Sequence, residues 1–343
     1  MNPSSRPAVS FCFTTFKRHD HLKSTLESVR AQTFGDYEVI VSDNDPAQSG
    51  RAVVEGMGDA RFKYFPNETN LGMKKSFNAS LNRSSGEYIV MIADDDPVYP
   101  DMLETLMKIK QEHPGYGMYL GASNWVVTDP FIATLYKVKT GVTPLLSAQP
   151  EGTVTTYSPS AFLKNFFNMN ILPYYLWSTG FVRRDIMVER GGVPDYGTAF
   201  LGDFAYLSVM GSHSGVVVIN KALGHQTIHT QNYGRDQNDQ IKMAAVNFVA
   251  YVGEKIRNVE GWPEIEKKMH HFVAVWVVSH LSFLHHYFRL SGSGKAVDLK
   301  PIEKEIFAVP FMKKYHFKYW LKTYFPRVHN MGVALKKKLS KSN

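Results

Sequence analysis

The sequence predicts an α/β fold, in which helices cover both faces of a mostly parallel β-sheet. Short apolar runs alternate with segments of helical periodicity along the N-terminal third of the 343-residue chain. Each run is apolar at consecutive positions, which is typical of strands that are buried on both faces. Polar residues follow three of these runs, and ligands of such sheets bind beyond the carboxyl ends of the strands. We therefore expect a ligand site at that edge.

Four apolar segments are predicted to form strands of this sheet. The first, AVSFCFTT at residues 8–15, contains Cys12, which we interpret as a small buried hydrophobe. It is the single cysteine of the chain, which excludes an intramolecular disulfide. The second segment ends in Asp43, Asn44 and Asp45, and the fourth is followed by three aspartates. The predicted strands are residues 8–15, 37–45, 61–66 and 87–92.

The segments between and after these strands have the signals of helices. Leu22, Leu26 and Val29 recur at helical spacing, and Asp20 is suited to the N-cap position before them. Pro100 is suited to the first turn of the last of these helices. The predicted helices are residues 20–32, 47–57, 70–82 and 100–113.

The character of the chain changes near residue 230, where we expect a domain boundary. The first domain, residues 1–232, holds the alternating segments and a Thr-, Pro- and Gly-rich stretch, 129–157, that is expected to be a long loop. Residues 233–290 should form a helical extension, with helices at about 235–258 and 263–290. A basic, aromatic tail, 291–343, begins with a flexible linker that reads SGSGKA.

Three adjacent carboxylates, Asp94, Asp95 and Asp96, follow the fourth predicted strand. Like charges so close together need a cation or hydrogen-bond donors to compensate them. A hard divalent cation such as Mn²⁺ or Mg²⁺ binds one or two carboxylates together with the phosphates of a substrate. The alternative is a solvated turn with an N-cap aspartate. The second acidic strand end, at Asp43, favours a site for a metal and a nucleotide.

Two stretches of this sequence resemble a known family. Residues 9–45, VSFCFTTFKRHDHLKSTLESVRAQTFGDYEVIVSDND, are similar to the opening strand–helix–strand of the family 2 glycosyltransferases. Residues 67–103, NETNLGMKKSFNASLNRSSGEYIVMIADDDPVYPDML, are similar to the central segment that runs into the Asp-x-Asp motif. The resemblance covers about residues 8–232. It implies the GT-A nucleotide-diphospho-sugar transferase fold, here with a helical C-terminal extension.

The resemblance implies roles for residues on the donor side. The nucleotide should lie against Thr15 and near Arg18, and Asp43 should hydrogen-bond the base. Asn70 and Gly72, in the sequence NLG, should belong to the rim of the donor site.

It also assigns the acidic cluster. Asp94 would face the ribose, Asp95 would be the principal metal ligand, and Asp96 would support the metal or the donor sugar. The chain departs from a common form of the motif, in which an aspartate stands at the position of Ala93. This departure makes the role of Asp95 a firmer expectation than that of Asp94.

On the acceptor side, an inverting transfer needs a base for the acceptor hydroxyl, and the matching residue is Asp203, which opens an apolar helix. A simple N-cap role is the alternative. Trp177 would stack on a sugar, although a core tryptophan is an equally ordinary interpretation. His229 fits the position of a phosphate or metal contact better than His225 does, and the alternative is a structural histidine. The Arg-Trp pair of processive relatives is absent, so we expect addition of a single sugar.

The resulting expectation is an inverting, metal-dependent glycosyltransferase that uses a UDP- or dTDP-linked donor. Its acceptor would be a lipid-linked glycan precursor of a surface polysaccharide. Two alternatives remain. One is a nucleotidyltransferase that makes nucleotide sugars, which should carry a Gly-rich phosphate loop that TTFKRHDH lacks. The other is a non-catalytic, membrane-bound protein that binds sugar nucleotides.

The tail is the most basic part of a chain whose net charge is +8. No acidic residue follows Glu305, and residues 306–343 contain nine Lys or Arg residues. Subtracting these nine charges from the total of +8 leaves residues 1–305 with a net charge of −1. Nine cations interleave with aromatic residues in 306–343, which is typical of segments at an anionic membrane surface. A packed helix with a solvated end is the alternative, and nucleic acid is not expected to be the partner. The nine cations are Lys313, Lys314, Lys318, Lys322, Arg327, Lys336, Lys337, Lys338 and Lys341.

The expected location is cytoplasmic, on the inner face of the cell membrane. The N-terminus lacks the basic and apolar regions of a signal peptide. The longest apolar stretch, FVAVWVVSHLSFL, is shorter than a membrane span and contains His280. Hydrophobic residues make up 44% of the chain, enough to form a sizeable core.

Overall fold

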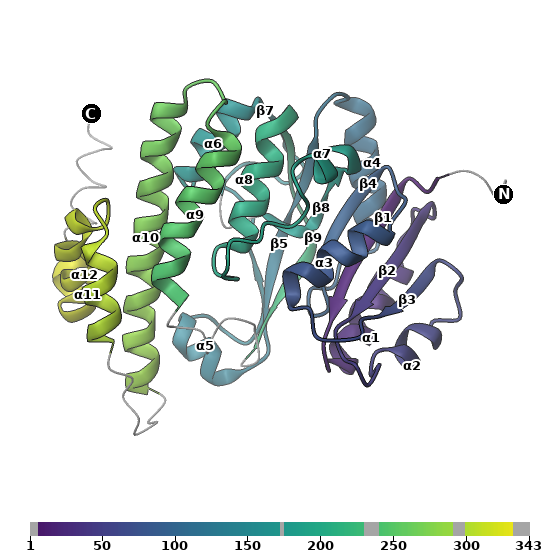
Figure 1. The fold of residues 1–343 in the computed structure, drawn as a ribbon, viewed down its shortest axis with the longest axis horizontal. Helices are drawn as coiled ribbons and strands as arrows, with labels where there is room; N and C mark the ends of the chain where they lie inside the picture. Colours follow the sequence, from purple (N-terminus) through teal and green to yellow (C-terminus); the bar gives the residue numbers. More distant parts are fainter. Residues whose placement is uncertain (1–5, 172–174, 230–239, 291–298, 332–343) are drawn as a thin grey trace.

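A computed structural model describes residues 6–171, 175–229, 240–290 and 299–331. Its centre is a nine-stranded sheet with the strand order β3-β2-β1-β4-β8-β5-β9-β7, and β6 pairs with β5 (Figure 1). The strands are β1 Val9–Thr15, β2 Tyr37–Asp43, β3 Phe62–Pro66, β4 Tyr88–Ala93, β5 Met118–Val127, β6 Gly141–Pro144, β7 Val154–Tyr157, β8 Tyr175–Arg183 and β9 Val216–Ile228.

The four strands predicted from the sequence form one parallel half of this sheet. β1 pairs in parallel with β2 and β4, and β2 with β3. In the other half, β8 runs antiparallel to both β4 and β5, while β9 is parallel to β5. The carboxyl ends of β1, β2 and β4 therefore lie at one edge, which confirms the mostly parallel α/β fold.

Helices cover both faces, as predicted. Phe11 and Phe13 of β1 face the side on which α1 and α4 pack. Cys12, between them, faces α3, α6 and α8 and is completely buried, as its sequence context predicted. The helices are α1 His19–Arg30, α2 Arg51–Glu55, α3 Met73–Arg83, α4 Met102–Glu112, α5 Pro130–Tyr136, α6 Pro159–Phe167, α7 Arg184–Glu189, α8 Gly202–Ser214, α9 Ile241–Ile256, α10 Trp262–Leu290, α11 Lys300–Ala308 and α12 His316–Tyr324.

Residues 129–157 were expected to form a long loop, and that expectation is wrong. The stretch contains α5, β6 and β7. The carboxylate of Asp129 accepts hydrogen bonds from the backbone N–H groups of Phe131 and Ile132, so it caps α5, and Pro130 occupies the first turn. A cap followed by proline is a helix-start signal that the Thr- and Gly-rich composition of the stretch obscured.

The helices of the extension share a hydrophobic core with the sheet. One cluster of buried side chains runs from β4 and β5 through α6 and α8 to α9, α10 and α11. Figure 1 shows α9 and α10 beside α6 and α8, with α11 and α12 on the outer side of α10. The predicted helices at 235–258 and 263–290 are confirmed as α9 and α10. The expected domain boundary and the SGSGKA linker lie outside the described residues.

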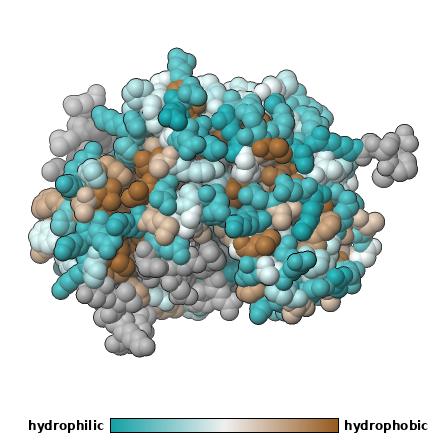
Figure 2. Space-filling model, in the orientation of Figure 1, coloured by the Kyte–Doolittle hydropathy of each residue, from teal (hydrophilic) through white to brown (hydrophobic). Residues whose placement is uncertain are grey.

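The C-terminal helices have an inner and an outer face. Ile306, Met312 and Tyr319 are buried against α9 and α10, so one face is packed, as the packed-helix alternative expected. Phe317 and Met331 are 69% and 73% exposed on the other face. Figure 2 shows hydrophobic residues among hydrophilic ones over this side of the molecule. Within the described ranges, no helix combines the length and the apolar character that a membrane crossing requires.

Candidate active site

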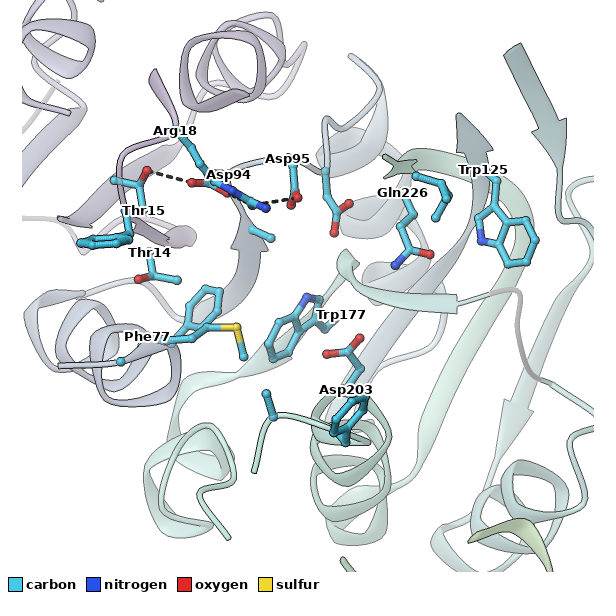
Figure 3. A pocket seen from close by; sticks show the side chains of 18 of the residues that line it. Thr14, Thr15, Arg18, Phe77, Asp94, Asp95, Trp125, Trp177, Asp203 and Gln226 are labelled. Atoms are coloured by element: carbon cyan, nitrogen blue, oxygen red, sulfur yellow. Dashed lines mark hydrogen bonds and ion pairs between the residues drawn. The ribbon is translucent and has the colours of Figure 1, made fainter. Parts of the chain in front are cut away.

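A cavity of about 880 Å³ opens at the edge where β1, β2 and β4 end (Figure 3). Most of the residues that the sequence singled out line it, although they come from segments almost 190 positions apart. The predicted site residues in its lining are Thr15, Arg18, Asn70, Gly72, Asp94, Asp95, Asp96, Trp177 and Asp203.

Arg18 and Thr15 compensate the first two carboxylates of the acidic cluster. Thr15 donates its Oγ1 hydrogen to Asp94 Oδ2 over 2.8 Å. Arg18 Nη1 lies 2.9 Å from Asp94 Oδ1 and 2.8 Å from Asp95 Oδ2, so one guanidinium bridges both groups. Burial, reinforced by the charge of Asp95, nevertheless raises the pKa of Asp94 to about 6.

Asp95 and Asp96 differ in their electrostatic environments. Burial acts to raise the pKa of Asp95, but its hydrogen bond with His229 and the charge of Arg18 outweigh burial and lower it. Asp95 is therefore ionised at neutral pH. Burial and the charges of Asp95 and Asp203 raise the pKa of Asp96 well above its ordinary value. The pKa values of these adjacent carboxylates are thus shifted in opposite directions.

His229, at the end of β9, lies in the acidic cluster. Its Nε2 is 3.2 Å from Asp95 Oδ2, and its ring stacks on that of His21 with centroids 4.8 Å apart. His21 belongs to α1 and was not predicted as a site residue. No sequence motif around His21 indicates a site residue, because it is the tertiary fold that brings His21 next to His229.

Asp43 is not among the residues that line the cavity. It is completely buried, and it accepts hydrogen bonds from the backbone N–H groups of Asp45 and Gly50 and from the Tyr64 hydroxyl. These bonds fix the turn after β2. Its neighbour Asn44 lines the cavity instead, so direct contact between Asp43 and a base stays a prediction that this position does not favour.

Asn70 and Gly72 of the NLG segment line the rim of the cavity. The backbone N–H of Gly72 donates to Asn70 Oδ1 over 2.9 Å, and that of Leu71 donates to Asn44 Oδ1 over 3.2 Å. Gly72 has a φ of 77°, a conformation that suits glycine, and α3 begins at the next residue. The rim is therefore tied to the end of β2.

Asp203 stands across the cavity from the acidic cluster, at the start of α8 (Figure 3). The preceding Leu201 has a positive φ of 63°, which turns the chain sharply into the helix. Among the described residues, none donates a hydrogen bond to the Asp203 carboxylate. Burial raises the pKa of this group to about 6. The Asp203 carboxylate thus accepts no hydrogen bond from the described residues and is still ionised at neutral pH.

The segment before Asp203 is anchored to the donor side. Lys74, in the first turn of α3, is buried and donates to the backbone oxygen of Thr198. Its Nζ also lies 4.3 Å from the centroid of the Tyr196 ring and 3.6 Å from Asp195 Oδ1. Sequence reasoning missed this lysine, because most lysines are exposed.

Trp177 is both a core residue and a wall of the cavity. It is 6% exposed, and its ring packs edge-on against Phe77 at 5.1 Å and Tyr206 at 5.5 Å between centroids. It also lines the cavity beside Asp203 (Figure 3). Both interpretations of this tryptophan are therefore compatible with its position.

The residues present fit a divalent cation that shares its coordination with a substrate. The described part of the chain holds no group of three or more His, Cys, Asp or Glu side chains placed to bind a metal. Asp95 and His229 provide one carboxylate oxygen and one imidazole nitrogen 3.2 Å apart. Such a pair suits a cation that takes its other ligands from a diphosphate and water.

Comparison with known proteins gives a family match and several relatives. The family described as "Glycosyl transferase family 2" matches residues 10–186, just over half of the chain. GalNAc(5)-diNAcBac-PP-undecaprenol beta-1,3-glucosyltransferase of Campylobacter jejuni is 34% identical over 118 residues. This match covers 34% of the present chain and 38% of that enzyme. UDP-Glc:alpha-D-GlcNAc-diphosphoundecaprenol beta-1,3-glucosyltransferase WfgD of Escherichia coli is 26% identical, over 36% of this chain and 51% of its own.

Solved structures share the fold over almost the whole chain. S. aureus TarS 1-349 in complex with UDP-GlcNAc superposes with a TM-score of 0.58 and 16% identity, covering 92% of this chain and 81% of that one. Mannosyltransferase PcManGT from Pyrobaculum calidifontis, in complex with GDP-Man and Mn²⁺, has a TM-score of 0.50 at 15% identity and covers 94% and 89%. At such identities the likeness shows a GT-A-type fold and nothing beyond it.

Proposed function

The chain belongs to glycosyl transferase family 2, and from this premise we propose that it transfers one sugar from a nucleotide-diphosphate donor to a glycan acceptor, with inversion at the transferred carbon. The observation that carries the proposal is the placement of Asp203. An ionised, unengaged carboxylate faces a cavity whose opposite side holds Arg18, Thr15 and the acidic cluster.

The donor would occupy the side of the cavity next to β1 and β4. Thr15 and Asp94 form a hydrogen-bonded pair against which a ribose can lie. Asn44 and the NLG rim provide further polar groups for the nucleotide. Asp95 and His229 would hold a divalent cation, Mn²⁺ or Mg²⁺, which neutralises charge on the departing diphosphate. Mn²⁺ accompanies GDP-Man in PcManGT, which supports divalent metal use in this fold.

Asp203 would act as the general base. As the bond between the sugar and the diphosphate breaks, the acceptor oxygen bonds to the sugar carbon and its proton passes to the Asp203 carboxylate. A base is most effective when its pKa is close to the working pH. The value of about 6 at Asp203 meets this requirement better than that of an exposed aspartate.

We propose that the acceptor is a lipid-linked glycan precursor of a surface polysaccharide. The names of both curated relatives include an undecaprenol-linked acceptor. The donor would be UDP- or dTDP-linked, and UDP is supported by the name of WfgD and by the TarS complex. The exposed aromatic and basic face of the C-terminal helices would hold the enzyme at the inner face of the membrane.

The test is transfer by the purified full-length chain. UDP- and dTDP-sugars would be supplied with Mn²⁺ and undecaprenyl-diphosphate-linked GlcNAc, and release of nucleoside diphosphate would be measured with and without the acceptor. Asp203→Asn is expected to lower the transfer rate by about 10²- to 10⁴-fold. Asp95→Asn is expected to weaken Mn²⁺ binding at least about tenfold.

Asp185→Asn provides the matched control, because Asp185 is a surface carboxylate on α7 whose side chain is 66% exposed. It should transfer sugar at the rate of the unmodified chain. Full transfer by Asp203→Asn would show that another group is the base. If the unmodified chain binds a nucleotide sugar but never transfers or hydrolyses it, the protein is a non-catalytic binder.

A further inference from the structure

The cavity has an aromatic side that the donor and the base do not occupy. We call six side chains of its lining the aromatic wall: Trp125, Tyr136, Phe200, Trp276, His280 and Phe283. The first two come from β5 and α5, and the last three from α10. Figure 3 shows Trp125 on the far side of the cavity from Thr15 and Asp94, with Asp203 between the two sides.

The rings of the aromatic wall form one continuous series. Phe200 lies 5.7 Å from Trp276 and 5.3 Å from His280 between centroids. Trp276 and His280 are stacked at 4.9 Å with their planes only 6° apart. Phe283 follows His280 at 6.3 Å and contacts the Tyr136 ring at 5.3 Å. The series begins at Phe200, three residues before the proposed base.

His280 is the polar exception in this wall. Its Nε2 is buried and has no hydrogen-bond partner in the described part of the chain. Burial lowers the pKa of the imidazole to about 4, so the ring is neutral near pH 7 and can donate one hydrogen bond and accept another. A buried polar atom without a hydrogen-bond partner destabilises the folded chain. A partner supplied by a ligand would remove this destabilisation.

We propose that the aromatic wall binds a sugar ring of the acceptor and that His280 hydrogen-bonds one of its hydroxyl groups. The inference rests on the proposed function, because the wall would hold the molecule whose hydroxyl Asp203 deprotonates. The flat faces of Trp276 and Phe283 match the apolar C–H face of a pyranose, while the hydroxyl groups at its edge need polar partners.

The single polar group among the rings favours a carbohydrate over a lipid chain at this position. An isoprenoid has no hydroxyl to satisfy His280, so its binding would leave Nε2 unpaired. A site that hydrogen-bonds a substrate hydroxyl discriminates strongly against analogues that lack it. His280 would therefore also help to select which acceptor sugar is bound.

The experiment measures binding of soluble probes to the full-length chain by calorimetry. Mn²⁺ and a saturating nucleoside diphosphate, chosen from UDP, dTDP and GDP by its own binding, fill the donor side. The probes are the octyl β-glycosides of glucose, galactose and N-acetylglucosamine. 1-Octanol, which has the same alkyl chain and a hydroxyl group but no sugar ring, serves as the lipid comparison. At least one glycoside is expected to bind about tenfold or more tightly than 1-octanol.

Variants of α10 test the assignment to His280. His280→Phe keeps the stacking but removes the polar atom, and it is expected to weaken glycoside binding about tenfold without changing nucleotide affinity. His280→Gln restores a polar atom near the position of Nε2 and should bind within about threefold of the unmodified chain. His286→Phe makes the same replacement on the same helix outside the cavity lining and should change nothing.

Three results would overturn the inference. One is the absence of glycoside binding by a chain that binds the nucleoside diphosphate. Another is equal binding of 1-octanol and the glycosides, which would make the wall a lipid groove. The third is unchanged glycoside affinity in His280→Phe. Failure of every nucleoside diphosphate to bind would instead refute the proposed function, and the inference with it.

Discussion

The carboxylate of Asp203 is buried without a hydrogen-bond donor among the described residues, and this lowers the free energy of unfolding when the group is ionised. Its pKa is about 6 in the folded chain, compared with an ordinary value of 3.8. Between these two values the folded state holds more protons than the unfolded state, so stability falls as the pH rises from about 4 to 6. Above pH 6 the full destabilisation is present, because the buried group is then charged.

Because the buried charge of Asp203 destabilises the fold, one substitution at this residue should have opposite effects on activity and stability. Asp203→Asn should lose transfer but should raise the free energy of unfolding at pH 8, by on the order of 2 kcal/mol. The gain should shrink as the pH falls from 6 towards 4. Denaturant unfolding at pH 8, 6 and 4 measures it, and transfer by the unmodified chain should increase through about pH 6. An Asp203→Asn protein that is less stable at pH 8 would contradict the prediction.

The sequence pointed to the acidic cluster more clearly than to the histidines His21 and His280. Three adjacent carboxylates at the end of a buried strand stand out in any reading of the chain. His21 and His280 do not, because an isolated histidine has no periodic or motif context. The ring contacts of His21 with His229 and of His280 with Trp276 exist only in the folded chain.

Among the helices, α10 is the one that makes the extension part of the enzyme. Trp276, His280 and Phe283 line the cavity, while Val273 and Val277 are buried in the core that reaches the sheet. The side chain of Ser282 on the same helix lies 2.8 Å from the Thr323 hydroxyl of α12. One helix therefore contacts the cavity, the core and the C-terminal helices.

The shared core predicts that the C-terminal helices unfold together with the sheet. Ile306 of α11 is completely buried in the same cluster as Leu207 of α8. Ile306→Ala should lower the free energy of unfolding by about 2–5 kcal/mol in a single transition. Thermal unfolding followed by circular dichroism and by tryptophan fluorescence would show whether the two signals coincide. The exposed Lys304→Ala on the same helix should change stability little, and a separate early transition would show an independent C-terminal unit.

The elements were predicted with unequal success. The strands of the parallel half are confirmed. β1, β2 and β4 are buried along almost their whole length and lead into polar residues, whereas β3 contains Lys63 and is partly exposed. β6 and β7 were missed, since each has only four residues and is partly exposed. Their pairing with β5 and β9 comes from contacts remote in sequence, which local composition does not encode.

Over the whole molecule, the distribution of charge and exposed aromatic rings predicts a membrane-facing side. Phe317 and Trp320 are 69% and 43% exposed, and their rings stack at 5.9 Å between centroids. Lys313, Lys314 and Lys318, close to them in the sequence, are exposed. A basic residue contributes about 1 kcal/mol near an anionic surface. Truncating the chain after Leu290 would remove buried residues such as Tyr319 and expose the hydrophobic surface of α9 and α10 that they cover, so substitutions give a cleaner test.

We predict that Phe317→Ser with Trp320→Ser reduces binding to anionic vesicles about tenfold or more, because two aromatic side chains no longer enter the interface. Flotation with vesicles of phosphatidylglycerol and phosphatidylethanolamine measures this. Val188→Ser with Met243→Ser is the matched control, since these apolar residues are 53% and 41% exposed elsewhere. Equal flotation of all three proteins would exclude this face as the membrane contact.

The two sides of the cavity come from different lengths of the chain, and this division has an evolutionary consequence. The family match ends at residue 186, before Asp203, His229 and the whole of α10. Most groups proposed for the donor precede that limit, whereas four of the six rings of the aromatic wall follow it. Under the proposed assignment of the two sides, substitutions in α10 would change the acceptor preference and leave the donor side intact. Homology alone would then identify the reaction long before it identified the glycan that is extended.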